Sequence, residues 1–133
     1  MSIYLLKTDG GSRGNPGPAA YSCVIYKESE VIYCDAKYMQ NATNNVAEYN
    51  GLLLGLEYCS RKKLAQIEIQ MDSELIVQQL LGKYQVKDEK MKELFTKVKK
   101  LLEKFEGYKI SHIPREENKL ADRLVNLILD SQI

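Results

Sequence analysis

The order of strand-forming and helix-forming segments constrains the fold of this 133-residue chain most strongly. Three β-prone runs come first, over 3–8, 20–26 and 31–38, and the second and third are rich in Tyr, Val, Ile and Cys. From residue 43 onward the pattern changes to helix, strand, helix, helix, strand and helix. This order predicts an α/β domain in which an antiparallel hairpin region leads into parallel strands joined by right-handed helical crossovers.

Capping residues and hydrophobic spacing give the expected limits of the later elements. Thr43 is a suitable N-cap for the first helix, and Ser73 for a short second helix that Gly82 closes. Gly51 and Gly55 cost that first helix roughly 1 kcal/mol each relative to alanine, so they predict close packing of its backbone against a sheet. The expected helices cover 46–61, 74–81, 88–105 and 118–129, and the expected strands cover 67–71 and 108–113.

The cysteines favour neither a disulfide framework nor a zinc site. They number three, and their spacing contains no CxxC or Cys/His ligand pattern. If the hairpin turns at Glu28 and Ser29, Cys23 and Cys34 are equally far from the turn and lie opposite each other. We still expect buried free thiols rather than a cross-strand disulfide, because reducing compartments disfavour that bond.

Charge and hydropathy exclude several classes of protein. The chain has 19 Lys and Arg against 18 Asp and Glu, so a formal net charge of +1 argues against a protein that holds nucleic acid by bulk positive charge. No stretch approaches the ~20 apolar residues of a membrane span, and the N-terminus lacks a secretory signal pattern. We therefore expect a cytoplasmic protein without a membrane partner. The length favours a single domain over residues 1–133, and we expect it to act as a stand-alone monomer.

A Gly- and Pro-rich segment, GGSRGNPGP, occupies residues 10–18 directly after the first strand. It matches neither phosphate-binding glycine motif, and it leads into a strand, whereas a nucleotide cradle needs a helix N-terminus to receive the phosphate. The simplest interpretation is a wide turn, with Asp9 as an ordinary carboxylate at the end of a strand.

Four acidic residues nevertheless occur where elements end or face small residues. Asp9 and Asp72 end strands, Glu48 lies among small residues on a helix, and Asp122 follows one turn into the last helix. Function in open α/β sheets gathers at the carboxyl ends of the strands, and clustered carboxylates cannot all ionise without cations. An all-carboxylate cluster favours Mg²⁺ and phosphodiester chemistry with two ions about 4 Å apart. Coincidental placement is the alternative, because 18 acidic residues are available.

Four sequence segments favour the metal site over coincidental placement of the acids. They are TDGGSRGNPGPA at 8–19, TNNVAEY at 43–49, MDS at 71–73 and PREENKLAD at 114–122. Together and in this order they resemble the motif set of the type 1 ribonuclease H family, over nearly the whole chain. The resemblance implies a ribonuclease H-like fold, with a five-stranded mixed sheet of three antiparallel and then two parallel strands, and with helices on both faces.

The resemblance also implies an endonuclease that hydrolyses the RNA strand of an RNA/DNA hybrid and leaves 3′-hydroxyl and 5′-phosphate ends. Two Mg²⁺ ions would serve as cofactors, with Mn²⁺ as a substitute. Carried onto the matching positions, Asp9 would bridge both ions, Glu48 and Asp72 would hold the ion on the leaving-group side, and Asp122 would hold the ion that activates water.

Substrate contacts follow from the same motifs. The family's minor-groove readers match Asn15, Asn44 and Asn45, with Gly10, Gly11 and Ser12 in the adjoining loop. Asparagine amides can bond 2′-hydroxyl groups, which distinguish RNA from DNA. The local alternatives are turn chemistry for Asn15 before a proline, and helix capping for Asn44 and Asn45.

The chain departs from the family pattern at two places. Many members carry a catalytic histidine on a loop before the last helix, but the only histidine here, His112, falls in a segment that indicates a strand. Arg115 resembles a basic residue that shorter members carry near the site, where it would act on the scissile phosphate or pair with an acid. The resemblance is to a short form of the family, for which we expect neither the basic, Trp-rich protrusion nor an N-terminal hybrid-binding domain. Lys83, Lys87 and the lysines that follow then form either a solvated surface or a replacement phosphate-binding surface.

Two other functions compete with the hybrid nuclease. One is a non-catalytic nucleic-acid-binding module that has kept the fold. The other is a related nuclease that prefers double-stranded RNA, which shape recognition through 2′-hydroxyl groups permits.

Overall fold

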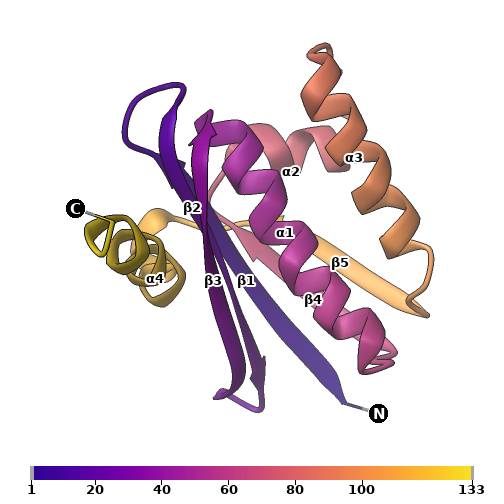
Figure 1. Ribbon diagram of the computed structural model, residues 1–133. Coiled ribbons are helices and arrows are strands. Elements are labelled where there is room, and N and C mark those ends of the chain that lie inside the picture. The colour runs from indigo at the N-terminus through magenta and orange to yellow at the C-terminus, as the bar shows by residue number, and fades with distance from the viewer. Residues whose placement is uncertain (1, 133) are drawn as a thin grey trace.

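The computed structural model describes residues 2–132 and contains one five-stranded sheet (Figure 1). Its strands are β1 Ile3–Ser12, β2 Gly17–Lys27, β3 Glu30–Ala42, β4 Gln66–Met71 and β5 Gly107–His112. They lie in the order β3-β2-β1-β4-β5. The pairs β1/β2 and β2/β3 are antiparallel, whereas β1/β4 and β4/β5 are parallel. This arrangement confirms the predicted mixed sheet.

Helices cover both faces of the sheet, as predicted. They are α1 Asn44–Arg61, α2 Glu74–Leu80, α3 Glu89–Leu102 and α4 Lys119–Asp130. Figure 1 shows α4 on one side of the sheet and α1 with α3 on the other. The main core lies between the sheet and α1, α2 and α3, and a smaller cluster of Ala20, Val125 and Leu129 lies under α4. Among residues 2–132, no helix combines the length and apolarity that crossing a membrane requires.

The two glycines of α1 allow the close approach that the sequence predicts. A Cβ added to Gly51 would lie 2.5 Å from the Asp9 carbonyl oxygen, and one added to Gly55 would lie 2.5 Å from Leu6 Cδ1. The helix backbone therefore rests directly on β1, and the start of α1 lies over the C-terminal part of that strand, where Gly10 meets Ala47 and Glu48.

The first strand is longer than predicted. Gly10, Gly11 and Ser12 continue β1 and pair with residues 21, 20 and 19 of β2, so only residues 13–16 form the loop. Asp9 consequently lies inside β1 rather than at its end. The expectation was wrong because Gly-rich sequence usually marks a turn, whereas these glycines stay extended beneath α1. A Cβ on Gly10 would lie 2.5 Å from the backbone nitrogen of Glu48.

The hairpin turns where predicted, but its register does not bring two cysteines together. Glu28 and Ser29 have φ of 51° and 70°, which suits a two-residue hairpin turn. A register shift between Ile25 and Tyr26 then places Cys34 opposite Val24 and Asp35 opposite Cys23. One extra residue in a strand moves the following side chains to the other face. The thiol of Cys23 is buried as expected, that of Cys34 is exposed, and both are free.

Smaller differences concern the ends of elements. The first helix begins at Asn44, two residues before the predicted start, with Thr43 as its N-cap as expected. The third helix ends at Leu102 rather than at residue 105. An unpredicted 3₁₀ turn, Arg115–Glu117, separates β5 from α4. The predicted strand 108–113 is observed as Gly107–His112, just before Pro114.

Candidate functional site

Three carboxylates meet where β1, β4 and α1 come together. Thr8 of β1 pairs with Met71, the last residue of β4, so the residues that follow, Asp9 and Asp72, lie side by side. Glu48 reaches them from the second turn of α1. One carboxylate oxygen from each of Asp9, Glu48 and Asp72 lies within 4.8 Å of the other two. These oxygens are close enough together to ligate a shared cation.

Burial makes it unfavourable for all three carboxylates to be ionised at once without a bound cation. Burial, and then the charge of Asp72, raise the pKa of Asp9 to about 7. Burial and the neighbouring Asp9 raise the pKa of Glu48 well above its ordinary value. Burial also raises the pKa of Asp72, and a hydrogen bond from Asn118 opposes this effect. At neutral pH the cluster therefore favours binding either protons or a cation.

The donor atoms fit a hard divalent metal ion. Glu48 Oε2 is buried and has no hydrogen-bond partner in the described part of the chain. A buried carboxylate oxygen without a partner is costly, and a metal ion would satisfy it. All the donors are carboxylate oxygens, which Mg²⁺, Ca²⁺ and Mn²⁺ prefer to softer nitrogen and sulfur ligands.

The fourth predicted acid, Asp122, lies in the first turn of α4 and lines one pocket together with Asp9, Glu48 and Asp72. It is not one of the three residues whose carboxylate oxygens lie within 4.8 Å of one another. Arg115 also lines the pocket, with Nη2 3.8 Å from Asp122 Oδ1, and its side chain is 79% exposed. The pocket has a volume of about 430 Å³. It is lined by Asp9, Gly10, Gly11, Ser12, Arg13, Asn44, Asn45, Glu48, Asp72, Ser73, Arg115, Asp122, Val125, Asn126 and Leu129.

Two of the predicted asparagines brace the loop between β1 and β2 against α1. Asn44 Oδ1 accepts hydrogen bonds from Ser12 N at 2.7 Å and Ser12 Oγ at 3.2 Å. Asn15 Oδ1 accepts one from Asn44 N at 3.1 Å. Thr43 caps the helix through its hydroxyl, which accepts from Val46 N at 3.2 Å, so neither Asn44 nor Asn45 is the N-cap. Asn44 and Asn45 line the pocket, whereas Asn15 is exposed outside its lining.

His112 occupies the strand-end position that its sequence context indicates. It is the last residue of β5, pairs with Met71 and is exposed. It is not among the residues that line the pocket. Of the two residues proposed for a phosphate or proton-transfer role, the fold brings only Arg115 to the pocket.

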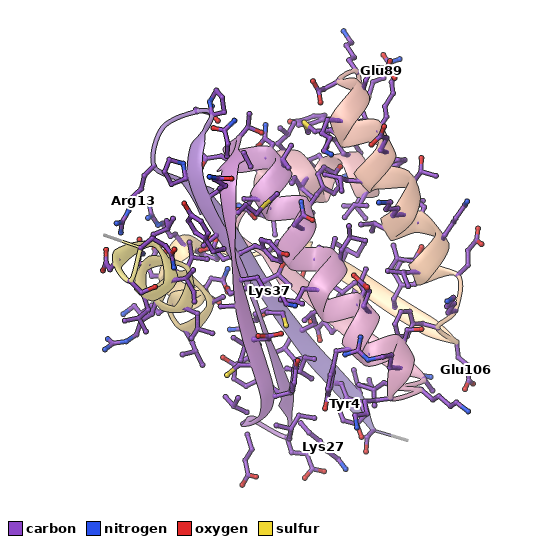
Figure 2. The ribbon with its side chains drawn as sticks, viewed as in Figure 1. Tyr4, Arg13, Lys27, Lys37, Glu89 and Glu106 are labelled. Atoms are coloured by element: carbon purple, nitrogen blue, oxygen red, sulfur yellow. The ribbon has the colours of Figure 1, made fainter. Side chains whose placement is uncertain are left out.

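Contacts from α4 and the turn before it hold this end of the sheet together, and the sequence motifs assign them no role. Ser22 Oγ donates to the Ala121 carbonyl oxygen at 2.7 Å, and Lys7 Nζ donates to the Glu117 carbonyl oxygen at 2.8 Å. Arg13 forms an ion pair with Asp130 at 2.5 Å, and Figure 2 shows Arg13 beside α4. These contacts join residues about 100 positions apart, so the only available signal was the polar residue types.

Asn118 is the functional candidate that the sequence reasoning missed. It is 1% exposed, and its Nδ2 donates to the Thr8 carbonyl oxygen at 2.9 Å. The available signal was its place in the last motif, four residues before Asp122. That position suggests a helix start, and the sequence does not indicate that the side chain turns inward.

Comparison with known proteins places the chain among ribonuclease H sequences. The family model described as reverse transcriptase-like matches residues 7–128. The chain is 37% identical over 129 residues to the bifunctional protein Rv2228c of Mycobacterium tuberculosis, a match that covers 96% of this chain and 35% of that protein. It is 37% identical over 123 residues to the ribonuclease HI of Halobacterium salinarum, which covers 92% of this chain and 62% of that protein. The chain thus spans about a third of the first relative and under two thirds of the second.

Solved structures show the same relationship. The N-terminal RNase H domain of Rv2228c matches with a TM-score of 0.94 and 36% identity, over 98% of this chain and 96% of that one. LC11-RNase H1, solved in complex with an RNA/DNA hybrid, matches with a TM-score of 0.92 and 41% identity, over 97% of this chain and 98% of that one. Together with the family model, which covers most of its length, these matches show that the chain belongs to the type 1 ribonuclease H family.

Proposed function

We propose that this protein is an endonuclease that hydrolyses the RNA strand of RNA/DNA hybrids, with two Mg²⁺ ions as cofactors, and leaves 3′-hydroxyl and 5′-phosphate ends. The observation that carries the proposal is the set of three carboxylate oxygens within 4.8 Å of one another. The relative LC11-RNase H1, which was solved with an RNA/DNA hybrid, supports the choice of substrate.

The carboxylates have separate roles in this proposal. Asp9, which has a carboxylate oxygen within 4.8 Å of one from Glu48 and one from Asp72, would bridge both ions. Glu48 and Asp72 would hold the ion on the leaving-group side, and Asp122 would hold the ion on the water side. Bound divalent ions lower the pKa of an attacking water and neutralise the departing 3′-oxygen. Because the pKa values of Asp9 and Glu48 are raised, metal binding would release protons from these groups. Mn²⁺ would substitute for Mg²⁺, since it takes the same oxygen ligands.

Asparagine side chains would recognise the RNA strand. The Oδ1 atoms of Asn15 and Asn44 accept local hydrogen bonds, so their amide groups are the natural donors to substrate. Asn45 lines the pocket beside Asn44 and would contact 2′-hydroxyl groups or base edges. Gly10, Gly11 and Ser12 line the pocket and would contact the sugar-phosphate backbone. The absent side chain of Gly11 leaves room for this approach, whereas that of Gly10 leaves room for α1.

Arg115 is the better candidate for contact with the scissile phosphate. It lines the pocket and is mostly exposed, whereas His112 lies outside the lining. We expect Arg115→Ala to lower kcat on the hybrid and His112→Ala to leave it near the wild-type value. The reverse order of effects would assign the role to His112.

The same proposal extends to the organisation of the protein. A single sheet covered by helices on both faces supports one catalytic domain over residues 1–133. An exposed free thiol at Cys34 is typical of proteins kept in a reducing compartment, which supports a cytoplasmic location. We propose a monomer.

Cleavage of a labelled hybrid with and without Mg²⁺ tests the function, with Asp9→Asn as the matched variant. The variant keeps the shape of the side chain and removes its charge, so we expect a folded protein, verified by circular dichroism, without turnover. Full activity of Asp9→Asn would refute the metal assignment. Hybrid binding without cleavage in Mg²⁺ or Mn²⁺ would favour the non-catalytic module, and faster cleavage of double-stranded RNA would favour the third function.

A further inference from the structure

Asn118 stands at the N-cap position of α4 but does not cap the helix. Asparagine is favoured at N-caps because its side-chain oxygen accepts a hydrogen bond from the first turn. Here the backbone has φ −122° and ψ 33°, and the side chain makes no capping hydrogen bond. The amide instead turns inward, where the residue is 1% exposed and Nδ2 donates to the Thr8 carbonyl oxygen at 2.9 Å.

This one residue is hydrogen-bonded to two segments that carry carboxylates of the site, and it lies beside a third. Thr8 directly precedes Asp9 in β1. The Asn118 carbonyl oxygen accepts from Asp122 N at 3.1 Å. The Asn118 side chain also lies close enough to the Asp72 carboxylate to oppose the rise in its pKa that burial causes. Asn118 therefore links β1 to the start of α4, next to the carboxylate of Asp72.

This placement of Asn118 stabilises the folded protein less than a side chain that capped α4 would. The helix lacks its cap, and Asn118 Oδ1 is buried without a hydrogen-bond partner within residues 2–132. A buried unpaired acceptor is uncommon in native proteins and calls for an explanation. Departures of this kind from the locally best arrangement concentrate at functional sites.

We propose that Asn118 is a positioning residue that sets the spacing of Asp9, Asp72 and Asp122 for divalent metal binding. The inference rests on the metal-dependent function proposed above. Mg²⁺ demands near-ideal octahedral geometry, so small errors in the placement of its ligands weaken binding. Groups that orient metal ligands through hydrogen bonds typically contribute about 10- to 100-fold to metal affinity.

Calorimetric titration of the protein with Mn²⁺, without substrate, tests this role. Asn118→Ala removes the side-chain contacts with Thr8 and Asp72 and keeps the backbone carbonyl bond to Asp122. Tyr49→Phe is the matched control. The Tyr49 hydroxyl donates a buried hydrogen bond to Gln79 Oε1 at 2.6 Å, so its loss also weakens the fold through one buried polar contact. We expect Asn118→Ala to bind Mn²⁺ about 10- to 100-fold more weakly than wild type, and Tyr49→Phe to bind it normally.

Kinetics on the hybrid give a second reading of the same variants. For Asn118→Ala we expect kcat to recover as the Mg²⁺ concentration is raised, with KM for the hybrid unchanged. A purely structural role would lower thermal stability without shifting the metal dependence. Mn²⁺ affinity of Asn118→Ala equal to wild type, or an equal loss in both variants, would overturn the proposal.

A measurement on the wild-type protein covers the case in which Asn118→Ala does not fold. The side-chain NH₂ resonances of Asn118 should shift on Mg²⁺ addition with the same midpoint as the backbone amides of Gly10 and Ser73. Resonances of Asn118 that stay fixed while those amides move would refute the positioning role. A wild-type protein that binds no Mn²⁺ would instead refute the metal centre itself, so the two failures are distinguishable.

Discussion

Gly51→Ala is expected to damage activity far more than stability. The added Cβ would lie 2.5 Å from the Asp9 carbonyl oxygen and 3.1 Å from the Ser22 carbonyl oxygen. Asp9 and Ser22 are paired across β1 and β2, so neither oxygen can move away independently. Because the interior is close-packed, α1 must lift from the sheet by roughly 1 Å to restore an ordinary contact.

The two consequences of this shift differ in size. Overpacking of this kind costs about 1–3 kcal/mol, and the better helix propensity of alanine offsets about 1 kcal/mol of it. Glu48 lies three residues before Gly51 on the same face of α1, so the lift also moves its carboxylate away from Asp9. A misplacement of about 1 Å at a reacting centre can cost on the order of 10²-fold in rate.

Gly55→Ala is the matched control, since the same change is made one turn further from Glu48. Its added Cβ would meet Leu6 Cδ1 at 2.5 Å, the mobile end of a side chain rather than strand backbone. The assay is kcat on an RNA/DNA hybrid at saturating Mg²⁺, together with thermal unfolding. We expect a large loss of kcat for Gly51→Ala and a small one for Gly55→Ala. Wild-type kcat in a folded Gly51→Ala protein would refute the link between this contact and the site.

Three further predictions concern pH, salt and thiol chemistry. The pKa of Asp9 rises from 3.8 to about 7 on folding, so between these pH values the metal-free folded protein holds a proton that the unfolded chain releases. The free energy of unfolding therefore falls as pH rises through this range, by on the order of a few kcal/mol. Thermal unfolding in the presence of a chelator should therefore give a lower Tm at pH 8 than at pH 5. Added Mg²⁺ should restore the Tm at pH 8. A Tm in chelator that does not fall between pH 5 and pH 8 would contradict this assignment of the Asp9 proton. Replacing Lys83 and Lys87 by glutamine should flatten the dependence of hybrid affinity on salt concentration, by about one unit of slope for each phosphate that is no longer neutralised, and an unchanged slope would leave them as solvated lysines. Iodoacetamide should label Cys34 alone in the native protein, as peptide mass spectrometry would show, and labelling of Cys23 and Cys59 at the same rate would contradict their burial.

Local chemistry in the sequence was sufficient to predict most elements. Thr43 and Ser73 cap the helices that they were expected to cap, and Gly82 follows the short second helix with φ of 81°. The alternation of Ile67 and Ile69 with polar neighbours identified β4. These features depend on residues a few positions apart, whose preferences act locally along the chain. The resemblance added which acids to expect at the site.

Register was the level at which sequence reasoning failed. The shift between Ile25 and Tyr26 moved Cys34 away from Cys23, and the pairing of Gly10 with β2 extended the first strand past Asp9. Both outcomes depend on how whole strands align with their neighbours. Composition and turn residues do not determine that alignment, because each register satisfies the same local preferences.

The sequence by itself determined the helices, the strands and the residue types that can bind a metal ion. Only the tertiary structure decided that Asp9 and Asp72 are neighbours, because the pairing of Thr8 with Met71 brings together strands more than sixty residues apart. It also decided that Glu48 meets them through close packing at Gly10 and Gly51, and that Asn118 turns inward rather than capping α4. Local propensities act within a turn or two of the chain, whereas a cluster of buried charges exists only once packing has excluded water from it.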